Sequence, residues 1–157
     1  MSERDVAGLL AESGVFEGLS DEQLEWIAGC GQIAPLAAGE MLFQEGEESN
    51  AFYLLRHGTV ALELYIPGRG PVIVSTHGAG ELVGWSWLFP PYRWHLDARI
   101  TEAGSAIVFD GACLRGKAES DHDLGFELMK RFAAQMVERL QETRLQILDV
   151  YGRAATG

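Results

Sequence analysis

Three of the four tryptophans in this chain of 157 residues lie in one short segment, residues 84–95. Its indoles and their polar neighbours are Trp85, Trp87, Trp94, Ser86, Arg93 and His95. Indole faces hold flat or cationic ligands, and a few placed polar groups orient such a ligand. We therefore predict that the segment binds a small molecule without covalent chemistry. Because buried tryptophan most often serves packing, a collapsed segment that binds nothing is the alternative.

The residues offer little for catalysis. The histidines at positions 57, 77, 95 and 122 form no HxH or HxxxH pair, so a metal-dependent double-sheet enzyme would lack its ligands. A haem sensor would need an axial ligand, for which His77 or His95 is the reasonable candidate. The sequence contains no nucleophile motif, phosphate-binding loop or dinucleotide fingerprint. We predict that the chain is not an enzyme and carries neither metal nor cofactor.

Charge and hydropathy limit the partners. Twelve basic and 23 acidic residues give a formal net charge of −11, with no basic cluster. Because nucleic-acid binding depends on Lys and Arg neutralising phosphates, we predict no direct contact with DNA or RNA. The sequence lacks a run of eighteen apolar residues, so no membrane span is expected.

The cysteines and the first residues suggest a compartment. Residues 1–5 are too polar and acidic for a secretory signal. Cys30 and Cys113 lack metal-ligand spacing and the density of a secreted disulfide framework. We therefore expect two reduced thiols in a cytoplasmic protein.

Three regions must position these residues. Residues 1–31 predict a helical lead-in, in which Ser20 and Gln23 have capping-box spacing. Residues 32–110, with the pocket segment at 80–95, predict a β-roll, because short apolar stretches alternate with glycine. The stretches are 41–44, 51–55, 60–64, 72–75, 96–101 and 106–109. Residues 111–157 predict helices.

The last helix, expected at about 124–151, begins after Asp121 or Asp123 as its N-cap and has a heptad seam. The seam consists of Phe126, Met129, Ala133, Met136, Leu140, Thr143, Ile147 and Val150. A second set could pack on the roll, namely Leu128, Phe132, Val137, Leu145 and Leu148. Because so much apolar surface exceeds what one small roll needs, the seam predicts a homodimer through a coiled coil.

Several segments together resemble the cyclic nucleotide-binding domain, and more narrowly the effector domain of Crp/Fnr-type regulators. They are Leu19-Ser20-Asp21-Glu22-Gln23-Leu24, Gly39-Glu40-x-Leu42-Phe43-x-x-Gly46, Phe52-Tyr53-Leu54-Leu55-x-x-Gly58-x-Val60, Arg139-Leu140-Gln141-x-Thr143 and Leu148-Asp149-Val150. The resemblance covers nearly the whole chain and implies a double-sheet jelly roll with a long C-terminal helix. Those regulators continue into a helix-turn-helix about where Gly157 ends this sequence, so we do not expect a transcription factor acting alone.

The resemblance also implies a nucleotide pocket. In the family, a Glu after a spaced glycine pair holds the ribose, and a later Arg holds the cyclic phosphate together with helix N-terminal amides. Gly80 and Gly84 match the glycine spacing, which places Trp85 on the Glu position. The other register would use Glu81 with Arg93 as the anchors.

Strand alternation favours the first register. Leu96, Ala98 and Ile100 should face the core, because the charged and polar residues between them would be costly there. The family's Arg shares that inward parity, so Trp94 takes its position. With tryptophan at both polar anchors, we predict no tight binding of cAMP or cGMP in the usual pose.

These observations predict a stand-alone sensor of α+β class, mainly β with flanking helices, that binds a small ligand and signals to a protein partner through its dimer helix. The resemblance adds Thr143, which reaches the nucleobase across the dimer, and its neighbour Arg144. The predicted ligand-binding residues are Val83, Gly84, Trp85, Ser86, Trp87, Arg93, Trp94, His95, Thr143 and Arg144. A ligand-free dimeric scaffold is the first alternative, and the metal-dependent enzyme is the second.

Overall fold

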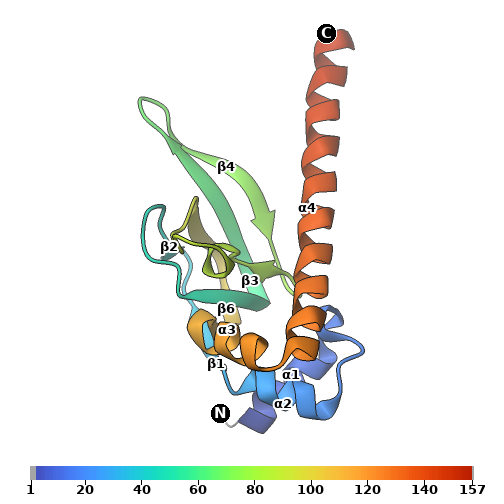
Figure 1. The fold of residues 1–157 in the computed structure, drawn as a ribbon. Helices are drawn as coiled ribbons and strands as arrows, with labels where there is room; N and C mark the ends of the chain where they lie inside the picture. The colour runs from blue at the N-terminus through green and yellow to red at the C-terminus, as the bar shows by residue number, and fades with distance from the viewer. Residues whose placement is uncertain (1–2, 157) are drawn as a thin grey trace.

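Two long antiparallel strands form the centre of the fold (Figure 1). In the computed structural model, which describes residues 3–156, these are β3 (Ala51–Ile66) and β6 (Asp97–Asp110). The short strands are β1 (Gly31–Leu36), β2 (Met41–Phe43), β4 (Gly70–His77) and β5 (Leu82–Val83). β1 and β2 pair with β6, whereas β4 and β5 pair with β3. The predicted β-roll is confirmed.

Each long strand replaces two of the short strands predicted from the sequence, because glycine lies inside the strand rather than at a corner. Gly58 has a φ of +89°, and a Cβ on Gly104 would lie 2.0 Å from the carbonyl oxygen of His57. Only glycine allows β3 and β6 to approach so closely, and their pairing register shifts on both sides of His57. The two glycines therefore permit a bend within continuous strands.

The helices flank this sheet and begin where the sequence indicates. They are α1 (Glu3–Glu12), the 3-10 turn η1 (Gly14–Phe16), α2 (Asp21–Ala28), the 3-10 turn η2 (Ser86–Leu88), α3 (Gly111–Ser120) and α4 (His122–Thr156). The capping box at the start of α2 is confirmed, with Ser20 Oγ accepting from Gln23 N–H at 3.1 Å. Asp121 rather than Asp123 caps α4, since its Oδ1 accepts from Leu124 N–H at 3.1 Å.

The first part of α4 packs on the rest of the chain, and the remainder projects. Leu124, Leu128 and Phe132 are buried, whereas residues 140–150 are all exposed. The predicted second apolar set is therefore correct for Leu128 and Phe132 but wrong for Val137, Leu145 and Leu148, which are 52%, 66% and 65% exposed. Val137 follows Phe132 by five residues, which turns it roughly 140° around the helix and away from the roll.

The buried residues form two cores. A helix-side core lies between α1, α2, α4 and one end of the sheet, and it includes Leu10, Ile27, Phe52, Trp87 and Phe132. A roll core includes Phe43, Leu55, Val83, Trp94 and Ile100. The tryptophans of the pocket segment are thus divided between two apolar clusters.

Cys30 and Cys113 form a disulfide, which corrects the expectation of two reduced thiols. β1 begins beside the end of β6, with Gly31 opposite Phe109, and Asp110 N–H donates to the carbonyl of Cys30. This pairing brings residues 83 positions apart to a Cα separation of 5.8 Å, which their spacing could not reveal. The thiol argument for a cytoplasmic location no longer holds.

Candidate ligand-binding site

Trp94 lies inside the roll and belongs to its core. It is 5% exposed and stacks on Phe43, with ring centroids 3.7 Å apart and 10° between the planes. The backbone N–H of Trp94 donates to the carbonyl of Glu47, and the backbone carbonyl of Trp94 accepts from the N–H of Gly46. The predicted inward parity is confirmed, since Ala98 and Ile100 are buried on the same alternation.

Gly84 makes room for this indole. Its φ is +102°, and a Cβ placed there would lie 2.8 Å from Cη2 of Trp94. A side chain at this position would therefore displace the ring, in addition to being strained in the left-handed region. The glycine of the pocket segment supports the packing of Trp94 inside the roll.

Trp85 and Trp87 face the other core. Trp87 is 2% exposed and stacks on Phe52 at 4.6 Å, and both indoles meet the ring of Phe132 edge-on at 5.7–5.8 Å. The guanidinium of Arg139 lies 5.0 Å from the centroid of the Trp85 ring, within the range of a cation–π contact. These contacts join η2 to α4.

A polar cluster continues this contact between the roll and α4. His77, at the end of β4, is 3% exposed, and its Nδ1 lies 3.1 Å from Oε2 of Glu81 while its Nε2 lies 2.8 Å from Oγ of Ser75. Glu81 also accepts from Gly78 N–H at 2.7 Å. Arg139 faces the cluster from α4, and its Nη2 is buried without a hydrogen-bond partner in the part of the chain described.

Burial lowers the pKa values of the two basic side chains of this cluster, His77 and Arg139. Burial first, and then the charge of Arg139, lower the pKa of His77, while Glu81 and Glu142 raise it in part. Burial also lowers the pKa of the Arg139 guanidinium, against the opposing charges of Glu81 and Glu142. His77 is therefore the neutral partner of a carboxylate in the folded protein. The i, i+4 spacing of His77 and Glu81 was a visible signal, but nothing in the sequence joined the pair to Arg139.

The structure does not gather the ten predicted ligand residues into one cavity. Val83, Gly84 and Trp94 belong to the roll, whereas Trp85, Ser86 and Trp87 lie at η2 beside the helix-side core. The remaining four, Arg93, His95, Thr143 and Arg144, are all exposed. Thr143 donates to the carbonyl of Arg139 on the projecting part of α4.

The alternative register places its two anchors apart. Glu81 is engaged by His77 and Gly78, as described above, whereas Nη1 of Arg93 donates to the carbonyl of Gly46 at 2.9 Å. No ion pair within residues 3–156 joins Glu81 to Arg93. These two residues therefore do not form a ribose–phosphate clamp in this structure.

Two features of the described residues bear on other classes of protein. Between residues 3 and 156, no three His, Cys, Asp or Glu side chains converge as a metal site would require. Over the same residues, no helix has the length and apolar character needed to cross a membrane.

The antiparallel roll, the turn between β5 and β6 and the long last helix define a domain of the cyclic-nucleotide-binding type. The sequence profile of the cyclic nucleotide-binding domain matches residues 34–121, more than half of the chain. The chain belongs to this family, in which the predicted resemblance to Crp/Fnr-type effector domains is confirmed.

Solved structures share the fold. A protein of Geobacter metallireducens GS-15 with a provisional cyclic nucleotide-binding name is 30% identical, with a TM-score of 0.77 over 85% of this chain and 97% of that one. The N-terminal domain of a transcriptional regulator from Streptomyces coelicolor A3(2) is 24% identical, with a TM-score of 0.66 over 88% and 94%. The second likeness shows the fold alone.

A curated relative is much larger. Lysophospholipase nte1 of Aspergillus fumigatus is 34% identical over 64 residues, which are 41% of this chain. The match spans 4% of the length of that enzyme. The family match over residues 34–121, rather than this short match, describes the domain.

The low pKa of His77 predicts a pH-dependent stability. Unfolded, His77 binds a proton near its ordinary pKa of about 6.5, but the folded protein binds it only at lower pH. The free energy of unfolding therefore has its full value above about pH 6.5, the ordinary pKa of histidine, and decreases as the pH falls from there toward the lower pKa of the folded protein. In urea melts, His77→Gln should flatten the decline of the unfolding free energy below neutral pH. The exposed His57→Gln control should keep the slope, and equal slopes for wild type and His77→Gln would contradict this assignment.

Proposed function

We propose that this chain is a regulatory domain of the cyclic nucleotide-binding family whose usual nucleotide pocket is filled by its own Trp94. The observation that carries the proposal is the ring stack of Trp94 on Phe43 against Gly84. Tryptophans at the positions proposed for the family's Glu and Arg leave neither a carboxylate for the ribose nor a cation for the cyclic phosphate. A nucleotide would have to displace an indole and would gain no charged partner.

The size of the packing term supports this proposal. Deleting a buried Trp or Phe costs about 3–5 kcal/mol, so moving Trp94 out of the roll costs an energy of that order. Since about 1.4 kcal/mol is a factor of ten, the displacement weakens nucleotide binding by at least about a hundredfold. The lost arginine–phosphate contact adds to this penalty.

The signal in this proposal passes through a dimer of α4. Leu140, Ile147 and Val150 of the seam are 51%, 50% and 64% exposed, and all of residues 140–150 are exposed. The β3–β4 hairpin, which extends from the roll in the same direction as α4, also exposes Tyr65 and Ile73 (Figure 1). Such apolar surface is typical of an interface.

Two finer points belong to the same proposal. The ligand is a small molecule other than a cyclic nucleotide in its usual pose, and its contact with the roll and α4 changes the arrangement of the dimer helix. The second candidate is a ligand-free dimeric scaffold, which the division of the predicted site residues between two cores favours. Both candidates are regulatory rather than enzymatic.

Titration with cAMP and cGMP tests the closed pocket. We expect no heat of binding and no change in intrinsic tryptophan fluorescence up to millimolar nucleotide, because Trp94 occupies the site. Fluorescence is read in parallel because a binding enthalpy near zero would escape calorimetry. Saturable binding at micromolar concentration by either method would contradict the proposal.

Leu140→Glu tests the dimer. Light scattering after size-exclusion chromatography should give twice the chain mass of 17.2 kDa for the wild type. Leu140→Glu should give the monomer, because dimerisation would bury two unpaired carboxylates in the seam. Gln141→Glu adds the same charge on another face of α4 and should remain dimeric. A monomeric wild type, or equal masses for both variants, would contradict dimerisation through this seam.

A further inference from the structure

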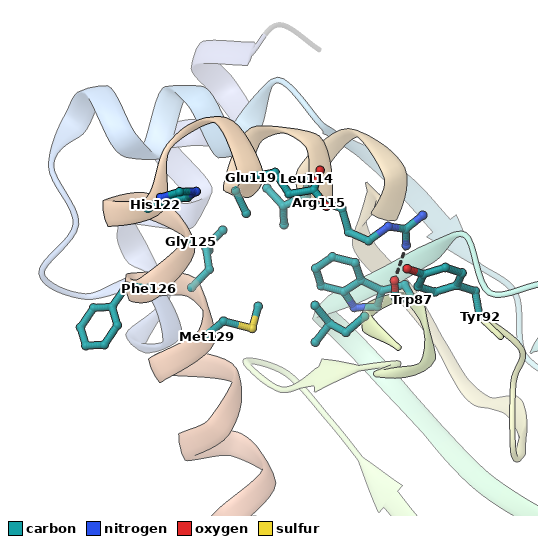
Figure 2. Close-up of a pocket in the computed structure, with 12 residues that line it drawn as sticks. Trp87, Tyr92, Leu114, Arg115, Glu119, His122, Gly125, Phe126 and Met129 are labelled. Atoms are coloured by element: carbon teal, nitrogen blue, oxygen red, sulfur yellow. Dashed lines mark hydrogen bonds between the residues drawn. The ribbon is translucent and has the colours of Figure 1, made fainter. Parts of the chain in front are cut away.

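A cavity outside the roll core lies where η2 meets the corner between α3 and α4. Its volume is about 410 Å³, within the range of small-molecule sites. Trp87 and Leu88 line one side, Leu114 and Ala118 line it from α3, and Leu128 lines it from α4 (Figure 2). Of the predicted ligand residues only Trp87 borders it, so the cavity is separate from the pocket that Trp94 closes.

Part of the wall of this cavity is buried and apolar. Trp87 and Leu128 are 2% and 1% exposed, and Trp87 is fixed between the rings of Phe52 and Phe132. The helix-side core therefore holds these two side chains of the wall in place. The cavity suits an aromatic or branched apolar body.

One end of the cavity carries an oriented cation. Arg115 of α3 donates from Nη1 to the carbonyl of Trp87, and its guanidinium lies 4.3 Å from the centroid of the Tyr92 ring. Tyr92, in turn, has a left-handed backbone with φ of +55°. A guanidinium has five N–H donors, and this hydrogen bond uses one of them. The group is therefore positioned to receive an anion.

A carboxylate of α3, that of Glu119, limits the charge of a ligand that the cavity can hold. Glu119 and His122, both exposed, lie on the side of the α3–α4 corner, whereas the Arg115 guanidinium points toward Trp87 and Tyr92 (Figure 2). Glu119 lies one helical turn after Arg115 on α3 and also borders the cavity, so its side chain disfavours ligands with several negative charges, such as nucleotides. The cavity suits one acid group at the Arg115 end.

We propose that this cavity binds a small apolar acid, with an aromatic or branched body against Trp87 and Leu128 and its single carboxylate or sulfonate on Arg115. Binding at this site does not require the proposed function. Only the effect of a bound ligand on the dimer helix rests on it. A ligand here touches η2 of the roll segment and both helices of the corner, so it would change how α4 leaves the roll.

The test is a fluorescence titration with anilinonaphthalene sulfonate, an aromatic acid that emits in apolar sites, and with the uncharged N-phenyl-naphthylamine. Arg115→Gln should weaken the sulfonate at least about tenfold, because a charge-assisted contact is lost, and leave the uncharged probe unchanged. Arg69→Gln, on the distant β3–β4 turn, should leave both unchanged. 1-Naphthoate, an aromatic carboxylate, should displace the sulfonate from the wild type in competition.

A second variant tests the chamber itself. Ala118→Phe fills the cavity and should abolish binding of both probes, whereas Ala112→Phe, on exposed surface of α3 outside the cavity, should not. Urea melts identify a variant that fails to fold, in which case Arg115→Gln with the probe pair decides. Equal sulfonate affinity in wild type and Arg115→Gln, or retained binding in a folded Ala118→Phe, would overturn the site. Neither result depends on cyclic nucleotide binding, whereas Phe126 and Met129 of the predicted seam also border the cavity.

Discussion

The interior of the roll is organised around one ring pair, Trp94 lying flat on Phe43 with centroids 3.7 Å apart. Two backbone hydrogen bonds tie Trp94 to Gly46 and Glu47, so the loop after β2 and the segment before β6 are joined around the indole. Gly84 must lack a side chain because a Cβ would meet the same ring at 2.8 Å. One large side chain thus constrains the backbone on both sides of it.

A second group of contacts joins the roll to α4. Trp85 meets Phe132 and Arg139, Trp87 meets Phe132, and His77 with Glu81 faces Arg139. All of these contacts lie before the fully exposed part of the helix. A rearrangement at the junction would change the direction of a helix whose residues 140–150 are exposed, which connects local packing to the proposed dimer.

Local signals in the sequence predicted local structure well. The Ser20–Gln23 capping box, a cap at Asp121 or Asp123 and the inward parity of Trp94 follow from local spacing; the structure confirms them, with Asp121 as the cap. Contacts between distant segments were beyond such signals, as the Cys30–Cys113 disulfide and the continuity of β3 and β6 through glycine demonstrate. The predicted site residues are divided between two cores for a similar reason. Strand alternation tells which face of a strand a tryptophan takes, but not which of the two cores that side chain enters.

The most direct test of the central claim observes Trp94 itself. Fluorine NMR of protein labelled with fluorotryptophan would give a resonance for each indole, and Trp94→Phe would assign the one at this position. The account predicts that this resonance has the shift of a buried indole and does not move on addition of millimolar cAMP. A shift that follows a saturable cAMP titration would show that the nucleotide enters the roll, and would contradict the closed pocket.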